Sequence, residues 1–217
     1  MAIEIIPQVL GPLENNSYLV ADTQTGEAVV IDPSFGIEKL ITQAQAKSWK
    51  IQSVWVTHAH FDHIIGASEI ARQTDVPLQI YLHQDDLALW DRGGEGLHFD
   101  IEIDPNIKPT HLLNHGQSIR LGDAHFEVRH TPGHTGGHVI YYNKDIAAAF
   151  CGDLIFYHGI GRTDLQGGDY NTLIDSIQTQ VFTLQPNTIL FCGHGRETTV
   201  IEEMNFNPFL PGISNQR

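Results

Sequence analysis

Thr57-His58-Ala59-His60-Phe61-Asp62-His63 is the stretch that decides the fold of this chain. It follows an apolar, β-branched run, Gln52–Thr57, which we expect to be a buried strand, and it precedes the helical pattern of Asp62–Gln73. His58 and His60 lie two residues apart, so their side chains point to the same side of an extended segment. Asp62 and His63 are adjacent, so their side chains diverge. This suits a site for two metal ions, the second of which lies beside a first ion held by His58 and His60. A polar surface loop is the alternative, but such loops are usually rich in glycine or asparagine.

Three later segments repeat one layout, in which an apolar strand ends in a glycine and a potential metal ligand. Phe126–Thr131 leads into Pro132-Gly133-His134, Ala147–Cys151 leads into Gly152-Asp153, and Ile189–Cys192 leads into Gly193-His194. The glycine lets the backbone turn sharply at the end of the strand, so that the next side chain enters a shared pocket. We therefore expect these three ligands to meet the first cluster at one edge of a sandwich of two sheets.

The order of the other elements supports a single domain over residues 1–217. Strands, helices, strands and helices follow one another, which favours two sheets with helices on their outer faces. The expected strands are Ile3–Leu10, Ser17–Ala21, Ala28–Asp32, Gln52–Thr57, Leu78–Tyr81, Ser118–Leu121, Ala124–His130, Val139–Tyr142, Ile146–Cys151 and Thr188–Cys192. The expected helices are Gly36–Trp49, Asp62–Gln73, Gln84–Trp90, Tyr170–Thr179 and Glu197–Phe206, and Gly93–Pro109 is expected to be a surface loop.

The composition narrows the class of function and the compartment. The formal net charge of −14 argues against binding to nucleic acid or to an anionic membrane, both of which need basic patches. Two cysteines are too few for a disulfide framework, and the N-terminus has no signal-peptide pattern, so we expect a cytoplasmic protein. No apolar run approaches the ~20 residues of a membrane span. Histidine is abundant, with 13 residues against 12 lysines and arginines together.

These motifs carry a resemblance to a known family. His-x-His-x-Asp-His, Gly-His-Thr, Gly-Asp and Gly-His in this order, over nearly the whole chain, resemble the metallo-β-lactamase superfamily. The resemblance implies an α/β (α+β) fold, the four-layer αββα sandwich, with its site at the edge where the sheets meet. It also implies one metal held by His58, His60 and His134, a second held by Asp62, His63 and His194, and Asp153 as a bridge between them.

The implied chemistry is hydrolysis by two divalent metal ions, with zinc expected first and iron or manganese as alternatives. Two metals about 3.5–4 Å apart can share one water and lower its pKa to about 7, which yields a bridging hydroxide at neutral pH. In catalysis, Asp62 and Asp153 are expected to hold both cations close, and Asp62 to orient the nucleophile. A thioester suits such a centre, because a thiolate leaves without a strong general acid.

Within the superfamily the chain is most similar to glyoxalase II, the hydroxyacylglutathione hydrolases, especially the short bacterial type. Gly133–His138, Gly152–Phe156, Gly159–Arg162 and Asn207-Pro208-Phe209 match blocks of those enzymes. The resemblance implies a small-molecule substrate, a glutathione thioester, with Arg162 and His138 as substrate-binding candidates. Arg162 can also pair with Asp164, and His138 can also support a ligand from behind.

Two other functions remain open at this stage, as do the acyl group, the thiol carrier and a monomeric or homodimeric state. Gly161-Arg162-Thr163-Asp164 also resembles the persulfide dioxygenases of the superfamily, in which one iron is held by residues matching His58, His134 and Asp153. A binding protein that keeps the fold without catalysis is the other alternative, although such proteins typically lose metal ligands.

Overall fold

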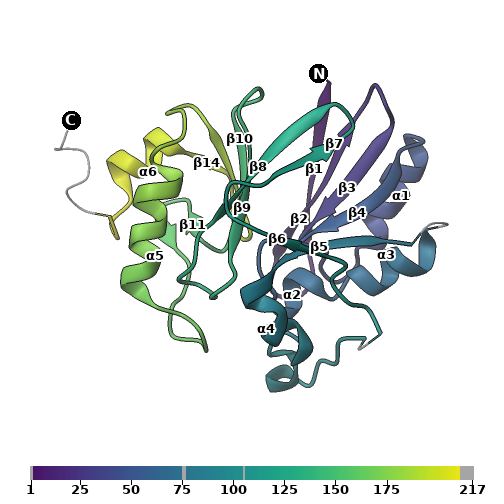
Figure 1. Cartoon of the computed structure of the whole chain (residues 1–217), viewed down its shortest axis with the longest axis horizontal. Helices are drawn as coiled ribbons and strands as arrows, with labels where there is room; N and C mark the ends of the chain where they lie inside the picture. The colour runs from purple at the N-terminus through teal and green to yellow at the C-terminus, as the bar shows by residue number, and fades with distance from the viewer. Residues whose placement is uncertain (1, 75–76, 105, 211–217) are drawn as a thin grey trace.

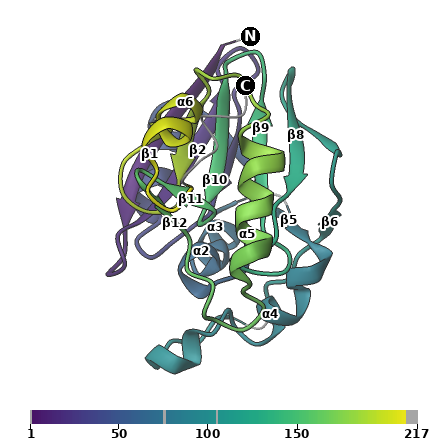
Figure 2. The ribbon, with the colours of Figure 1, turned by 90° about the vertical axis from the view of Figure 1, so that its left-hand side faces the viewer.

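Two six-stranded β-sheets packed face to face form the centre of the molecule. The structure is a computed structural model, which describes residues 2–74, 77–104 and 106–210. Helices α1 and α3 cover the outer face of one sheet, and α5 and α6 cover the outer face of the other (Figure 1). Figure 2, which views the molecule from the side of α5 and α6, shows these two helices in front of the second sheet. The layers are therefore those of the predicted αββα sandwich.

The first sheet is built from the N-terminal half of the chain, with its strands side by side in sequence order. They are β1 (Ile3–Leu10), β2 (Asn15–Asp22), β3 (Glu27–Ile31), β4 (Lys50–Trp55), β5 (Gln79–His83) and β6 (His111–Leu113). The first three are antiparallel, whereas β3 to β6 run parallel. Parallel neighbours need crossovers, which contain α1 (Glu38–Ala46), α2 (Phe61–Ile64), α3 (Ala67–Gln73), α4 (Leu87–Asp91) and the 3₁₀ turns η1 (Gln84–Asp86) and η2 (Gly96–Phe99).

The second sheet follows in the C-terminal half, in the order β14-β13-β10-β9-β8-β7. Its strands are β7 (Ser118–Leu121), β8 (Ala124–His130), β9 (Val139–Asn143), β10 (Ala148–Gly152), β13 (Ile189–Cys192) and β14 (Thr198–Thr199). β10 and β13 are parallel, and the crossover between them contains the hairpin β11 (Ile155–Phe156) and β12 (Gly159–Ile160), then α5 (Tyr170–Ser176) and the π-helical turn η3 (Ile177–Val181). The last helix, α6 (Val200–Phe206), follows β14.

Three hydrophobic clusters hold the four layers together. Alternate residues of one strand serve two of them, because successive side chains of a strand point to opposite faces. On β2, Tyr18 and Val20 face the cluster between the sheets, whereas Leu19 and Ala21 face the cluster under α1 and α3. The third cluster packs α5 and α6 on the second sheet. The inner strands β3, β9 and β10 are thus buried on both faces, which explains their nearly continuous apolar sequences.

Most predicted elements are confirmed, and the differences have local causes. The predicted helix Asp62–Gln73 is wrong as a single helix, because Gly66 separates α2 from α3. There the chain passes so close to Ser34 that a Cβ on Gly66 would lie 2.6 Å from its carbonyl oxygen. The expected loop Gly93–Pro109 contains η2, and its residue 105 lies outside the described residues. The predicted helix Glu197–Phe206 begins only at Val200, since the two preceding threonines form β14.

Four short strands were not expected from the sequence: β6, β11, β12 and β14. Each has two or three residues, too few to show an alternating pattern. The predicted helix Tyr170–Thr179 is also longer in the structure, because η3 continues α5 to Val181.

Candidate metal centre

The structure brings all seven predicted ligands to one edge of the sandwich. His58 and His60 lie in the extended segment between β4 and α2, and Asp62 and His63 lie on α2. The other three, His134, Asp153 and His194, follow β8, β10 and β13. The pairing of β10 with β13 shifts by one residue after Phe150, so that Gly152 lies opposite Cys192. Such an irregularity re-aims side chains, and both strands deliver their ligands to the same place.

Three imidazoles form the first group of ligands. His134 Nε2 lies 2.9 Å from His60 Nδ1 and 3.2 Å from His58 Nε2. A tetrahedral zinc ion with Zn–N bonds of about 2.0–2.1 Å holds its nitrogens about 3.3 Å apart. The spacing of these three nitrogens therefore fits a shared cation.

Asp62, His63 and His194 form the second group. Asp62 Oδ2 lies 3.5 Å from His63 Nε2 and 3.3 Å from His194 Nε2. Asp153 lies between the two groups, because its Oδ2 is 3.8 Å from His134 Nε2 and 3.6 Å from His194 Nε2. Among the described residues, the buried Asp153 Oδ1 has no hydrogen-bond partner. A buried acceptor without a donor is rare, and a cation would satisfy it.

The second ring nitrogen of three ligand histidines has a fixed partner. His134 Nδ1 donates to the Arg162 carbonyl oxygen at 2.8 Å, and His194 Nδ1 donates to the Leu13 carbonyl oxygen at 3.0 Å. His63 Nδ1 lies 3.0 Å from Asp32 Oδ2. Metal-binding histidines usually donate their other N–H in this way, which fixes the tautomer and the ring orientation. In all three, Nε2 faces the centre, where His63 Nε2 also lies 3.0 Å from Asn15 Nδ2. A fourth ligand histidine, His58, contacts Thr57 Oγ1 through Nδ1 at 3.1 Å.

Asp32 is a buried carboxylate that contacts both Thr57 and the ligand His63, and it was not predicted from the sequence. Its Oδ1 accepts from the Thr57 amide at 2.7 Å, and its Oδ2 accepts from Thr57 Oγ1 at 2.6 Å as well as facing His63. The carboxylate is buried at 1% exposure. Asp32 could have been suspected from the sequence, because it directly follows an apolar strand, much as Asp153 follows another strand after one glycine. It was missed because no histidine lies beside it in the sequence.

The electrostatics keep the first group in the form that binds metal. Burial, followed by the neighbouring histidines, lowers the pKa of His58 well below its usual value and lowers the pKa of His60 to about 3. Burial also lowers the pKa of His134. These imidazoles are neutral at pH 7, and a neutral imidazole has the free lone pair that a metal needs.

His63 behaves in the opposite way. Burial, the largest single influence, lowers its pKa, but Asp62, Asp153 and Asp32 together raise it to about 10. Without a cation, the His63 imidazolium balances these carboxylates. Binding of a cation in the second group would displace that proton, so metal uptake there is coupled to proton release.

A pocket opens over the ligands and offers both apolar and charged contacts. Beside the ligands His60, Asp62, His134, Asp153 and His194, it is lined by Leu13, Phe61, Gly94, Glu95, His98, Phe99, Arg162 and Leu165. Arg162 therefore lies where a substrate-binding residue was predicted, although its guanidinium is held by Asp164 through two contacts of 2.8 Å. His138 is fully buried behind His58 and does not line the pocket, so a direct contact with substrate is not available to it in this structure.

Two other features of the described residues lie apart from this centre. The imidazoles of His83 and His130 approach a metal-like grouping with Asp85, but their rings stack at 4.0 Å and 11°, so their in-plane lone pairs do not converge.

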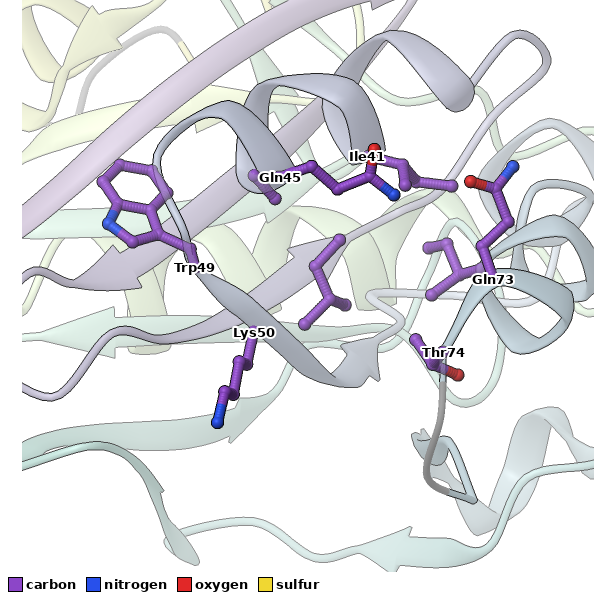
Figure 3. Close-up of a pocket in the computed structure, with 9 residues that line it drawn as sticks. Ile41, Gln45, Trp49, Lys50, Gln73 and Thr74 are labelled. Carbon is purple, nitrogen blue, oxygen red and sulfur yellow. The ribbon is translucent and has the colours of Figure 1, made fainter.

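A separate cavity beside α1 and α3 is lined by side chains such as Ile41, Trp49 and Gln73 (Figure 3). It contains none of the seven ligands. None of the described helices is long and apolar enough to span a bilayer.

Comparison with known proteins gives a consistent result. A family model described as the metallo-beta-lactamase superfamily matches residues 10–194. The probable metallo-hydrolase YqgX of Bacillus subtilis is 39% identical over 210 residues, covering 94% of this chain and 96% of the relative. The hydroxyacylglutathione hydrolase GloC of Haemophilus influenzae is 33% identical over 211 residues, covering 97% of this chain and 98% of that protein.

Solved structures of similar proteins share the whole fold. The B3 metallo-beta-lactamase BLEG-1 superposes with a TM-score of 0.86 at 36% identity, covering 97% of this chain and 100% of the other. TTHA1623 in a di-iron-bound form superposes with a TM-score of 0.84, also at 36% identity, covering 94% of this chain and 100% of the other. The fold, the clustered histidines and aspartates, and the family match agree: this chain belongs to the metallo-β-lactamase superfamily, as its motifs predicted.

Proposed function

We propose that this metallo-hydrolase is a thioesterase of the hydroxyacylglutathione hydrolase type that holds two divalent metal ions. The observation that carries the proposal is the position of Asp153, whose carboxylate reaches ligands of both groups at 3.5–3.8 Å. A carboxylate so placed suits a pair of cations better than a single one. In this assignment His58, His60 and His134 hold one metal, Asp62, His63 and His194 hold the other, and Asp153 bridges them.

The donor set suits several metals. Imidazole and carboxylate ligands bind zinc, iron and manganese, and we propose zinc, with iron and manganese as alternatives. When bound, the metal pair would supply a water molecule acidic enough to act as a nucleophile at neutral pH. The buried Asp62 carboxylate faces His63 and His194 at the floor of the pocket, where it would orient that water.

The pocket offers a small thioester apolar surface and one strongly basic side chain. Leu13, Phe61, Phe99 and Leu165 offer apolar surface for the substrate and exclude water from it. Among the described residues that line the pocket, Arg162 is the only lysine or arginine, so we assign it one carboxylate of the substrate. The relative GloC, at 33% identity over almost its full length, supports a hydroxyacylglutathione as that substrate. We further propose a single domain over residues 1–217, a cytoplasmic location, and a monomeric or homodimeric state.

The direct test is turnover of S-D-lactoylglutathione by metal-replete protein, with release of free glutathione as the readout. Replacing His58 by alanine should lower the rate at least about 10³-fold, because a centre that supplies the nucleophile loses a ligand. His125→Ala is the matched control, since His125 is an exposed histidine on β8 and belongs to neither ligand group. Equal rates for the wild type and His58→Ala would remove this centre from the reaction.

A persulfide dioxygenase is the second candidate, because Arg162-Thr163-Asp164 resembles that group and His58, His134 and Asp153 lie together as its iron ligands would. It predicts one iron per chain and oxygen uptake with glutathione persulfide. Two metals per chain and no oxygen uptake would support the thioesterase. A protein that binds both metals and cleaves no thioester or ester would instead support a non-catalytic role.

A further inference from the structure

A buried carboxylate outside the predicted ligand set connects two loops of the metal centre. Asp86, the last residue of η1, is only 1% exposed. None of the ion pairs among the described residues involves it, so no cation balances its charge. Burial raises the pKa of Asp86 above its usual value, and the hydrogen bonds to the carboxylate offset only part of this rise. A buried, unpaired carboxylate is costly, and the position must therefore supply something that an apolar side chain does not.

The hydrogen bonds of Asp86 show what it supplies. Its Oδ2 accepts from the amide of Ala59 at 2.9 Å and from Thr135 Oγ1 at 2.8 Å. Its Oδ1 accepts from the amide of Gly137 at 2.7 Å. Ala59 lies between two ligands of the first group, His58 and His60, and Thr135 follows the third ligand, His134. One side chain thus ties together the two loops that form the first group.

The loop that follows His134 packs closely against Asp86 at Gly137. A Cβ on Gly137 would lie 2.5 Å from the Asp86 amide nitrogen and 2.8 Å from its carboxyl carbon, so only glycine allows the loop to approach this closely. On the other side of the same loop, His130 Nε2 donates to the Gly136 carbonyl oxygen at 2.8 Å. The His134 loop is therefore fixed from two directions, and Asp86 sets its distance from the His58 loop.

The second group of ligands is anchored elsewhere. The His63 ring is held by Asp32 at 3.0 Å, and the His194 ring by the Leu13 carbonyl oxygen at 3.0 Å. Neither contact involves Asp86 or the loop after β8. A substitution of Asp86 should therefore weaken metal binding by the first group more than metal binding by the second group.

We propose that Asp86 is a positioning residue for the metal site of His58, His60 and His134, and that it holds the two loops at the separation at which their three nitrogens converge. The inference rests on the metal centre assigned above, but not on its substrate. It predicts that loss of the Asp86 carboxylate weakens one of the two metal sites and spares the other.

The test uses Asp86→Asn, which keeps the size of the side chain but places an amide N–H against one of its present donors. Zinc bound per chain is measured during titration with a chelator, without substrate. Affinity for one equivalent should fall about 10- to 100-fold, as for other residues that orient metal ligands, while the second equivalent stays at the wild-type affinity. Asp85→Asn is the matched control, because this adjacent carboxylate is exposed and contacts His83 rather than the two loops.

If Asp86 has a purely structural role, Asp86→Asn should lower the melting temperature and weaken the binding of both zinc equivalents together, which would overturn the proposal. Binding of both equivalents by Asp86→Asn as tightly as by Asp85→Asn would overturn it as well. If Asp86→Asn does not fold, Thr135→Val removes a single donor and should weaken the same one equivalent to a smaller degree; unchanged binding there would refute the idea. A wild type that binds no metal would defeat both this inference and the proposed function. A wild type that binds two metals without cleaving thioesters would defeat the proposed function alone.

Discussion

Gly193 is the residue at which the proposed bridge can be tested with the smallest change. A Cβ at this position would lie 2.1 Å from Asp153 Oδ1, 2.9 Å from His63 Cε1 and 3.0 Å from the Gly152 carbonyl carbon. Ordinary contacts begin at 3.4 Å, so in Gly193→Ala either the Asp153 carboxylate or the backbone must move by more than ~1 Å. The backbone at Gly193 is itself held, because its N–H donates a hydrogen bond to the Gly152 carbonyl oxygen at 2.7 Å. The carboxylate is the part free to move.

A displacement of about 1 Å in a catalytic constellation costs about 10²-fold in rate, which corresponds to about 2.7 kcal/mol of transition-state stabilisation. We therefore expect kcat/KM of Gly193→Ala for S-D-lactoylglutathione to fall about 10²-fold, and metal content to drop below that of the wild type. Both are measured on protein reconstituted with the same excess of zinc, with melting temperature recorded to show that the variant is folded.

Gly136→Ala is the matched control for this prediction. Gly136 also lies in a ligand loop, but a Cβ there would meet nothing within 4 Å. Its activity and metal content should stay close to the wild type. Wild-type behaviour of Gly193→Ala would show that Asp153 does not need its present position, and equal losses in both variants would show that the effect does not pass through this carboxylate.

Two further predictions concern the groups behind the ligands and the effect of pH. Asp32→Asn should weaken the metal held with His63 about 10- to 100-fold in a chelator titration, because the ring loses its orienting carboxylate; Glu38→Gln, an exposed change on α1, should not. In the metal-free protein, stability should be greatest near pH 6.5 and decline on both sides. Below pH 6.5 the imidazole of residue 60 is protonated in the unfolded chain, but in the folded protein His60 accepts a proton only near pH 3, so the free energy of unfolding falls by up to ~1.4 kcal/mol per pH unit. Above pH 6.5 the folded protein still holds the proton on His63 that the unfolded chain has lost, so the free energy of unfolding falls as the pH rises toward 10. Urea melts of the chelated protein at pH 5, 6.5 and 9 check this, and a flat profile would contradict it.

The ligands could be predicted from the sequence because each has a local signature. An apolar strand that ends in a glycine and then a histidine or aspartate is visible within six residues, and the three strands of this kind bring their ends together at one sheet edge. The fourth signature is the dense His58–His63 cluster. The inner strands were predictable for a similar reason, since burial on both faces gives β3, β9 and β10 nearly continuous apolar runs.

Asp32 and Asp86 could not be predicted because their roles depend on partners distant in the chain. Asp86 bonds to residues 27 and 51 positions away, and in the sequence it is only one polar residue of the predicted helix Gln84–Trp90. The break between α2 and α3 has the same cause, because Gly66 is required by the close approach of Ser34 and not by its own neighbours. Helical periodicity continues across the break and conceals it.

The origin of the ligands in both halves of the chain has a consequence for folding kinetics. His58 to His63 come from the first sheet, whereas His134, Asp153 and His194 come from the second, so neither sheet alone offers a complete coordination sphere. High-affinity capture of a cation has to wait until the two sheets have docked, and the docked sheets cannot separate without releasing it. Zinc should then slow unfolding, and a folding rate that zinc leaves unchanged would place the docking of the two sheets after the transition state.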